Sequence, residues 1–324
     1  MGYVKLSRFF GLLLVVIGVV ALFYVLSPGE GSPFKKLFKM VTKEISVEEK
    51  YDINDLKHLS IDDSSMNIDI IPGSSSQAIV RMTGSVSKNV FNEYKLEGRK
   101  DGDTLRIKTK SGDGWNWFTW STVKLTIELP EKQWEEFTVY TNSGNISVQQ
   151  VLSTKLSLKT SSGNIQAKEV EGQAISLKST SGNIKLSEAS SDDVELKTSS
   201  GNITVEEYEA KQIDINTVSG NIKAIEGLSE IKAKSSSGNI TIKGEDLLHD
   251  TDLKSTSGNV TIDVYNEPTS LAVDYSGGSG QGNIKISNFS YETKSNDRDV
   301  IKGAFGTGET ELIVRTSSGN FTLK

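Results

Sequence analysis

"TSSGNIQAKEVEGQAISLK" (residues 160–178) decides the fold, because similar stretches precede and follow it at an almost constant distance. Each contains the triplet Ser-Gly-Asn, and from Gly144 to Gly258 successive triplet glycines are separated by 19, 19, 19, 19, 18 and 20 residues. A degenerate copy, "GQGNI", contains Gly282, and a last copy contains Gly319. A fixed period of this length indicates stacked structural units, each formed by one coil of chain.

Apolar residues recur at fixed positions in every copy. The positions seven and five residues before the glycine are aliphatic, as in Ile175 and Leu177, and so are those two and four residues after it, as in Ile184 and Leu186. Polar residues lie between them, so each copy predicts two strands that are buried on one face. We therefore predict an all-β fold, a β-solenoid that resembles a parallel β-helix with rungs of about 19 residues. An antiparallel sandwich would not explain the constant period.

The triplet is predicted to form the corner of each coil. Glycine adopts positive φ without steric cost, and asparagine tolerates it better than most residues. Stacked asparagines are expected to bond to one another along the rod, and hydroxyls three residues before the glycine are expected to form a second ladder. The predicted corner residues are Gly144, Asn145, Gly163, Asn164, Gly182, Asn183, Gly201, Asn202, Gly220, Asn221, Gly238, Asn239, Gly258, Asn259, Gly319 and Asn320.

The N-terminus predicts a membrane anchor. Residues 9–26, "FFGLLLVVIGVVALFYVL", are eighteen residues without a charge, long enough for a transmembrane helix. A cleaved signal peptide and a buried core helix are the alternatives, but no small-x-small cleavage site follows the apolar run. The predicted division is a basic N-terminus over 1–8, an anchor over 9–26 and a juxtamembrane linker over 27–44.

The orientation of this anchor is less clearly encoded. Lys5 and Arg8 precede it, whereas four lysines follow it within residues 35–43, so a count of flanking charges favours a cytoplasmic C-terminus. A short basic N-terminus before one apolar segment is nevertheless typical of signal-anchors. We expect a single-pass protein of the cell membrane whose C-terminal domain is extracytoplasmic.

Residues 45–135 lack the period and predict a β-rich N-terminal cap, with the Ser-Gly-Asn solenoid over 136–324. Residues 59–72 resemble one degenerate coil with Met66 in place of glycine, and a hairpin is expected to turn at Asp101-Gly102. "GGSGQG" (277–282) is expected to be a loop insertion, because it lacks the lysine and helix of a phosphate-binding loop.

Three of the four tryptophans lie in "GDGWNWFTW" (residues 112–120). Buried, Trp115, Trp117 and Trp120 would plug the end of the solenoid core. Exposed, they would stack on sugars or lie at a membrane interface. Burial is the expectation, and a binding surface is the alternative.

A column of basic residues lies four residues before the glycines and faces solvent by alternation. Acidic residues six before the glycine, Glu195, Asp214 and Asp252, are expected to offset part of its charge. The column is either a solvated face that discourages aggregation or a surface for an anionic envelope polymer or envelope protein. Its lysines are Lys159, Lys178, Lys197, Lys234 and Lys254, with Asn216 and Arg315 in the same register.

Composition excludes several classes of function. The chain has no cysteine, so disulfides and thiolate metal sites are absent. The net charge of −6 comes from interleaved acids and bases, which argues against nucleic acid as a partner. The two histidines, His58 and His249, belong to no triad, and acidic residues scatter over the columns. We expect no catalytic residues, no cofactor and no metal site.

The N-terminal apolar segment, the strand ending "IELP" (127–130) and the many "SGNI" corners resemble the bacterial putative-adhesin family, a domain family of unknown function. The layout is more closely similar to the LiaG-type membrane-anchored proteins. The resemblance implies a cell-envelope location and a link to envelope-stress responses. The expected function is that of a non-catalytic, membrane-anchored adhesin or scaffold. The alternatives are an intracellular solenoid scaffold and a polysaccharide-active β-helix enzyme.

Overall fold

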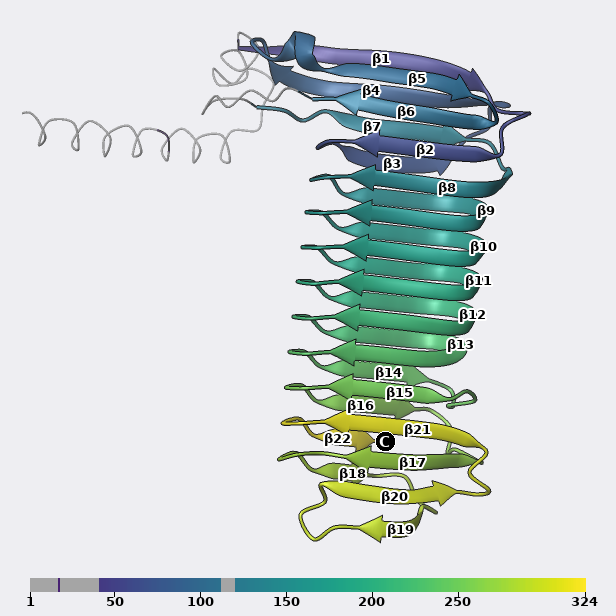
Figure 1. Cartoon of the computed structure of the whole chain (residues 1–324), viewed down its shortest axis with the longest axis vertical. Helices are drawn as coiled ribbons and strands as arrows, with labels where there is room; N and C mark the ends of the chain where they lie inside the picture. The colour runs from purple at the N-terminus through teal and green to yellow at the C-terminus, as the bar shows by residue number, and fades with distance from the viewer. Residues whose placement is uncertain (1–16, 18–40, 112–119) are drawn as a thin grey trace, which may run out of the picture.

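The computed structural model describes residue 17 and residues 41–111 and 120–324, and its strands form one rod of stacked coils (Figure 1). Nearly all of the predicted anchor and linker lie outside the described residues. Within them, no helix has the length and apolar character needed to cross a membrane. The all-β prediction is confirmed, and parallel strands of successive coils pair as a solenoid requires.

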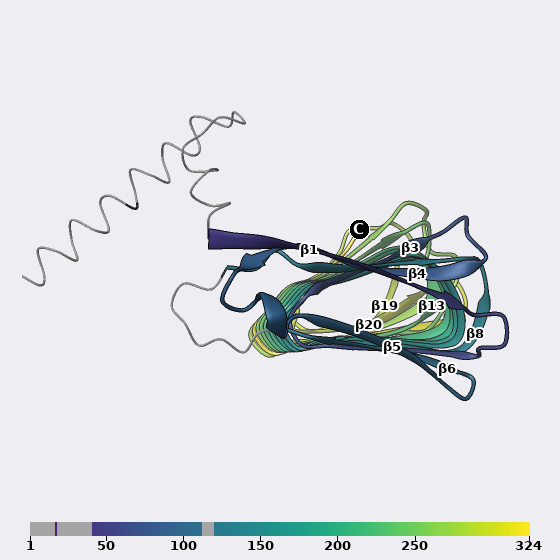
Figure 2. The ribbon, with the colours of Figure 1, turned by 90° about the horizontal axis from the view of Figure 1, so that it is seen from above.

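The middle of the rod is regular because the sequence repeat sets the strand register. Ile165 lies between Ile146 and Ile184, so identical positions of neighbouring coils are paired. Seen from above, the coils superpose around one flattened core (Figure 2). These strands are β8 (Gln133–Thr141), β9 (Ile146–Thr160), β10 (Ile165–Ser179), β11 (Ile184–Thr198), β12 (Ile203–Thr217) and β13 (Ile222–Ser235).

The N-terminal end is built by coils that do not stack in chain order. The coil of β2 and β3 pairs with β8 and β9 on one side and with β6 and β7 on the other. Antiparallel strands then finish the end, with β5 on β6 and β1 on β4. The bounds are β1 (Thr42–Asp52), β2 (His58–Asp63), β3 (Asn67–Pro72), β4 (Gln77–Ser87), η1 (Phe91–Glu93), β5 (Lys95–Asp101), β6 (Thr104–Lys110) and β7 (Lys124–Leu129).

Two predictions for this end are confirmed. β5 and β6 form the hairpin that turns at Asp101-Gly102, where Gly102 has a φ of 61°. The coil over residues 59–72 is also present, and its Met66 carbonyl lies directly against Gly144 of the next coil. The cap is therefore continuous with the solenoid, as predicted.

The C-terminal end contains an exchange of order that the sequence period does not show. β21 lies between β15 and β17, and β22 lies between β16 and β18, so the last copy of the repeat is inserted before the preceding one. Antiparallel β20 and β19 close the rod. The bounds are β14 (Ile240–Gly244), β15 (Thr251–Ser255), β16 (Val260–Val264), β17 (Leu271–Ser276), β18 (Gly282–Ile284), β19 (Ser290–Lys294), β20 (Val300–Phe305), β21 (Thr310–Thr316) and β22 (Phe321–Leu323).

The buried tryptophan of the described chain is not in the predicted cluster. Trp134 is 1% exposed and packs edge-on against Phe137 under the cap. Trp120 is 52% exposed, so it does not plug the core, and for this residue the burial prediction is wrong. Trp115 and Trp117 lie outside the described residues.

Candidate functional site

The triplets lie at bends between strands, but their glycines are needed for a different reason from the one predicted. A Cβ on Gly182 would lie 1.9 Å from the carbonyl oxygen of Gly163, and the same clash recurs in each coil. Positive φ is absent from all the triplets, so the conformational argument is wrong. Glycine is required because successive corners stack too closely for any side chain. Among described glycines, positive φ occurs at Gly84, Gly102, Gly306 and Gly308.

The asparagines form a continuous ladder, although not between amide groups as expected. The backbone N–H of Asn164 donates to Oδ1 of Asn145 at 2.8 Å, and Asn183 donates to Asn164 in the same way. This bond satisfies a corner N–H that no strand partner reaches. In spatial order the ladder contains Asn67, Asn145, Asn164, Asn183, Asn202, Asn221, Asn239, Asn259, Asn320 and Gln281.

The C-terminal end of this ladder corrects the prediction for the degenerate copy "GQGNI". The backbone N–H of Gln281, not that of Asn283, donates the last bond of the ladder to Oδ1 of Asn320, and a Cβ on Gly280 would lie 1.8 Å from the Gly319 oxygen. The corner glycine of this copy is therefore Gly280, two residues before the predicted Gly282. "GGSGQG" is part of a coil and not a loop insertion.

Buried hydroxyls fix the corners from inside. Thr198 donates to the carbonyl oxygen of Gly182 in the preceding coil at 2.9 Å, and Ser179 and Thr160 do the same one and two coils earlier. The predicted hydroxyl ladder thus bonds to backbone and not from hydroxyl to hydroxyl. In the first coil Asp63 occupies this position and accepts from Thr109, Thr141 and the Met66 N–H.

The second turn of each regular coil is where left-handed backbone occurs. Its residues have φ between 51° and 55° and are Gln150, Glu169, Glu188, Glu207 and Glu226. Glutamate has no intrinsic preference for this region. Lys168 bridges Glu169 and Glu188, whereas Glu207 forms no ion pair with any residue that the structure describes.

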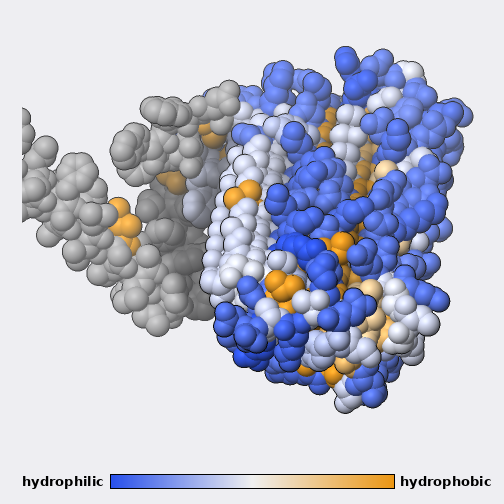
Figure 3. Space-filling view, turned by 60° about the horizontal axis from the view of Figure 1, so that its bottom comes forward, coloured by the Kyte–Doolittle hydropathy of each residue, from blue (hydrophilic) through white to orange (hydrophobic). Residues whose placement is uncertain are grey.

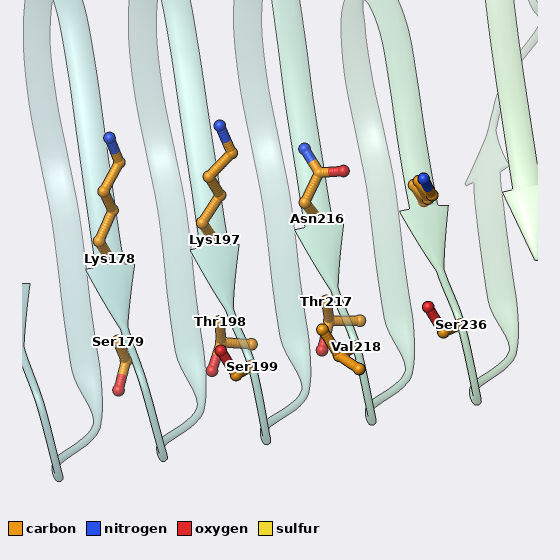
Figure 4. Close-up of a pocket in the computed structure, with 10 residues that line it drawn as sticks. Lys178, Ser179, Lys197, Thr198, Ser199, Asn216, Thr217, Val218 and Ser236 are labelled. Carbon is orange, nitrogen blue, oxygen red and sulfur yellow. The ribbon is translucent and has the colours of Figure 1, made fainter.

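The basic column lines a groove that runs along the rod beside the corners. Figure 4 shows Lys178, Lys197 and Asn216 side by side on successive strands, with Ser179 and Thr198 nearer the corner. The groove has a volume of about 450 Å³ and spans four coils. We call it the lysine groove, and it is lined by Lys178, Ser179, Lys197, Thr198, Ser199, Asn216, Thr217, Val218, Lys234 and Ser236.

The border of the lysine groove on the corner side is rich in hydroxyls. Positions one and two before the glycine are serine or threonine in nearly every copy, as in Ser199 and Ser200, and most are exposed. A pale strip runs along one edge of the rod in Figure 3, and serine, threonine and glycine have this intermediate hydropathy. Hydroxyls both donate and accept hydrogen bonds, so this border can contact any oxygen-rich ligand.

Acidic residues on the opposite side of the column neutralise part of its charge, as predicted. Glu195 pairs with Lys178 at 2.6 Å and also with Lys197. Asp252 pairs with Lys254 at 2.7 Å, whereas Asp214 accepts a bond from the Asn216 amide.

The pKa of Glu195 is lowered by its two lysine partners. Partial burial raises this pKa, but the hydrogen bonds from Lys178 and Lys197 outweigh burial and hold it at about 2. Among the described residues, Lys159 and Lys234 have no acidic partner. The charge of the basic column is therefore partly neutralised at Lys178 and Lys197. Lys159 and Lys234, which lie four coils apart, keep their charge without an acidic partner among the described residues.

A second groove of about 360 Å³ lies on the acidic side of the column. It brings Asp193, one of the acidic residues that the sequence leaves scattered, next to Glu195 and Asp214 of the acidic column. A glycosidase needs a carboxyl whose pKa is raised to serve as general acid, and that of Glu195 is lowered instead. In the part of the chain that the structure describes, no group of three acidic or histidine side chains could hold a metal ion.

Two features of the site were not predicted from the sequence, the double ion pair of Glu195 and the ladder ends at Asn67 and Gln281. The coil register would have found the first, because Glu195 stands two residues from Lys197 and one coil from Lys178. Nothing in the sequence marks Gln281, since its coil is entered after an exchange of order.

Comparison with solved structures found similar chains of low identity. One is "a putative adhesin" from Bacteroides fragilis, 14% identical, with a TM-score of 0.43, covering 87% of this chain and 97% of its own. Another is a "putative lipid binding protein" from Parabacteroides distasonis, 17% identical, with a TM-score of 0.49, covering 86% and 96%. Comparison with curated proteins found no match. The sequence profile of the family described as Toastrack DUF4097 matches residues 56–324, which is most of the chain. The chain belongs to the Toastrack DUF4097 family.

Proposed function

We propose that the protein is a non-catalytic rod that binds a linear anionic polymer of the bacterial cell envelope along the lysine groove. The observation that carries this proposal is the groove itself, in which lysines recur on successive coils beside a border of hydroxyls. Ammonium groups supply charge, and the hydroxyls supply hydrogen bonds to phosphate or carboxylate oxygens.

The geometry favours a polymer over a small ligand. Each coil advances the rod by about 4.8 Å and presents the same groups again. A ligand of repeating units can engage several coils together, and weak contacts then add through effective concentration. The unpaired Lys159 and Lys234 lie on coils four steps apart, roughly 19 Å along the rod.

The envelope location rests on the sequence. The apolar segment over 9–26 supplies the anchor, and the resemblance to LiaG-type proteins supports an extracytoplasmic rod linked to envelope stress. A reporter fused after Lys324 tests the orientation. Alkaline phosphatase fused there should be active. Fluorescence from a reporter that matures only in the cytoplasm would contradict the extracytoplasmic orientation.

Binding is tested by replacing three lysines of the groove with glutamine, in Lys178→Gln, Lys197→Gln and Lys234→Gln combined. The full-length protein, in uncharged detergent, is titrated with poly(glycerol phosphate) at low salt. Affinity should fall by about tenfold, because each exposed ionic contact contributes up to about 1 kcal/mol. The control combines Lys185→Gln, Lys223→Gln and Lys243→Gln on the strands after the corner, an equal charge change that should preserve affinity. Unchanged affinity in the groove variant would reject the proposal.

A further inference from the structure

We infer that the Glu195 carboxylate competes with the polymer for two lysines of the groove, Lys178 and Lys197. This competition sets the affinity of the groove for the polymer. This inference rests on the proposed function and names the residue that tunes it. A bound polyanion and the Glu195 carboxylate require the same ammonium groups of Lys178 and Lys197. Binding at the end of the groove formed by these two lysines must therefore displace Glu195 from at least one of them.

The geometry of Glu195 supports competition over simple structural support. Its Oε2 lies 2.6 Å from the Lys178 ammonium and also accepts from the Ser176 hydroxyl at 3.1 Å, while Oε1 takes the Lys197 ammonium. Both lysines are about 40% exposed, at 42% and 44%, and the Glu195 side chain is 32% exposed. All three groups are thus reachable from the groove without opening the core.

No other described residue of the acidic column, six positions before the glycines, binds two lysines of the basic column. Asp214 holds only the Asn216 amide, and Asp252 holds only Lys254, which lies outside the groove lining. Before Glu195 the same column carries Ser157 and Ser176, which leaves Lys159 without a counter-charge. The sequence thus places one carboxylate beside the two lysines at one end of the groove and leaves Lys234, at the other end, without an acidic partner among the described residues.

The pKa of Glu195 is held at about 2 by its two lysine partners, so its carboxylate is charged at neutral pH. Competition is therefore expected at neutral pH. It also acts selectively, because a ligand with few charges cannot offset the loss of two ion pairs, whereas a long polyanion can.

The test is the isosteric change Glu195→Gln in the full-length protein, titrated with poly(glycerol phosphate) over a range of salt concentrations. Affinity should rise by about three- to tenfold, the factor expected for releasing exposed ion pairs. The plot of log affinity against log salt should become steeper, because two more lysines contact phosphate. A gain of affinity cannot come from partial unfolding.

The matched control is Glu206→Gln, which removes one acid from the ion pair with Lys185 on the strands after the corner. Its exposure, 29% for Glu206 and 47% for Lys185, matches that of the Glu195 pair. This control should leave affinity within about twofold. An equal gain in both variants would assign the effect to net charge and overturn the inference. If Glu195→Gln changes nothing while the triple lysine variant weakens binding, the inference fails and the proposed function stands.

Discussion

At the scale of single residues, the corner is a device for close stacking. Glycine is needed because the carbonyl of the preceding corner fills the space of a Cβ, and asparagine is needed because its side-chain oxygen reaches the backbone N–H of the next corner. The repeated Ser-Gly-Asn therefore encodes contact between coils more than the shape of any one coil.

Replacing Gly182 with alanine should destabilise the rod strongly. The new Cβ would lie 1.9 Å from the Gly163 oxygen, so the coils must separate or the ladder must break. The free energy of unfolding should fall by about 3 kcal/mol or more, measured by chemical denaturation. The control is Gly244→Ala, where a Cβ meets nothing within 4 Å and stability should hold or rise slightly. Equal effects at the two sites would disprove the stacking explanation.

Replacing Glu207 with asparagine should stabilise the protein. Glu207 is exposed and has a φ of 53°, a conformation that asparagine adopts at lower cost. The gain should be about 0.5–1 kcal/mol, seen as a higher melting temperature. The control Glu209→Asn, two residues along the same strand in extended backbone, should give no gain. A loss at position 207 would show that the glutamate makes a contact worth more than the strain.

At the scale of elements, the coils are joined by repeated contacts between side chains, and Glu195 of the acidic column forms ion pairs with two lysines of the basic column. Its carboxylate links β10 to β11 through Lys178 and then returns to Lys197 on its own strand. Asp63 likewise links neighbouring coils inside the cap. Its buried carboxylate accepts hydrogen bonds from Thr109 of β6 and Thr141 of β8.

Acidification should remove the contribution of Glu195. Its pKa is lowered in the folded state from 4.5 to about 2, so the stabilisation is complete above pH 4.5 and is lost as pH falls towards 2. After solvent screening the loss is about 1–2 kcal/mol. The wild type should therefore lose more stability than Glu195→Gln between pH 5 and pH 2 in paired denaturation curves. Parallel curves for the two proteins would contradict this explanation.

The inserted C-terminal coil is the element that chain order hides. β21 and β22 fill a level of the rod that the chain leaves empty between β16 and β17. Removing residues 310–324 should lower the melting temperature by exposing two core surfaces, and a synthetic peptide of these residues should restore it. A scrambled peptide is the control, and equal rescue by both would argue against a specific vacancy.

At the scale of the whole molecule, the period in the sequence predicted the solenoid because each apolar column is visible in every copy. Ile165, Ile184 and Ile203 occupy one column and all are buried. The exchange of the last two coils could not be predicted, because the aliphatic columns of Gly258, Gly280 and Gly319 coils are compatible in either order. The exposure of the Trp120 side chain could not be predicted either, since an aromatic cluster has the same composition whether it is buried or exposed.

The candidate groove was predictable only in part. Alternation placed Lys178, Lys197 and Lys234 on an outer face, but the ion pairs of Glu195 depend on the register between coils. That register also shows which lysines remain available. The rod thus presents a polar groove whose side chains recur at constant spacing, and its proposed role depends on which lysines a polymer can reach.

The most direct test of this account is the chemical reactivity of individual lysines with and without poly(glycerol phosphate). An amine-acetylating reagent and mass spectrometry give the rate at each position in the full-length protein. Binding of the polymer should protect Lys159, Lys178, Lys197 and Lys234, whereas the rates of Lys185 and Lys223, on the strands after the corner, should not change. Protection spread equally over both sets, or absent from the groove, would contradict it.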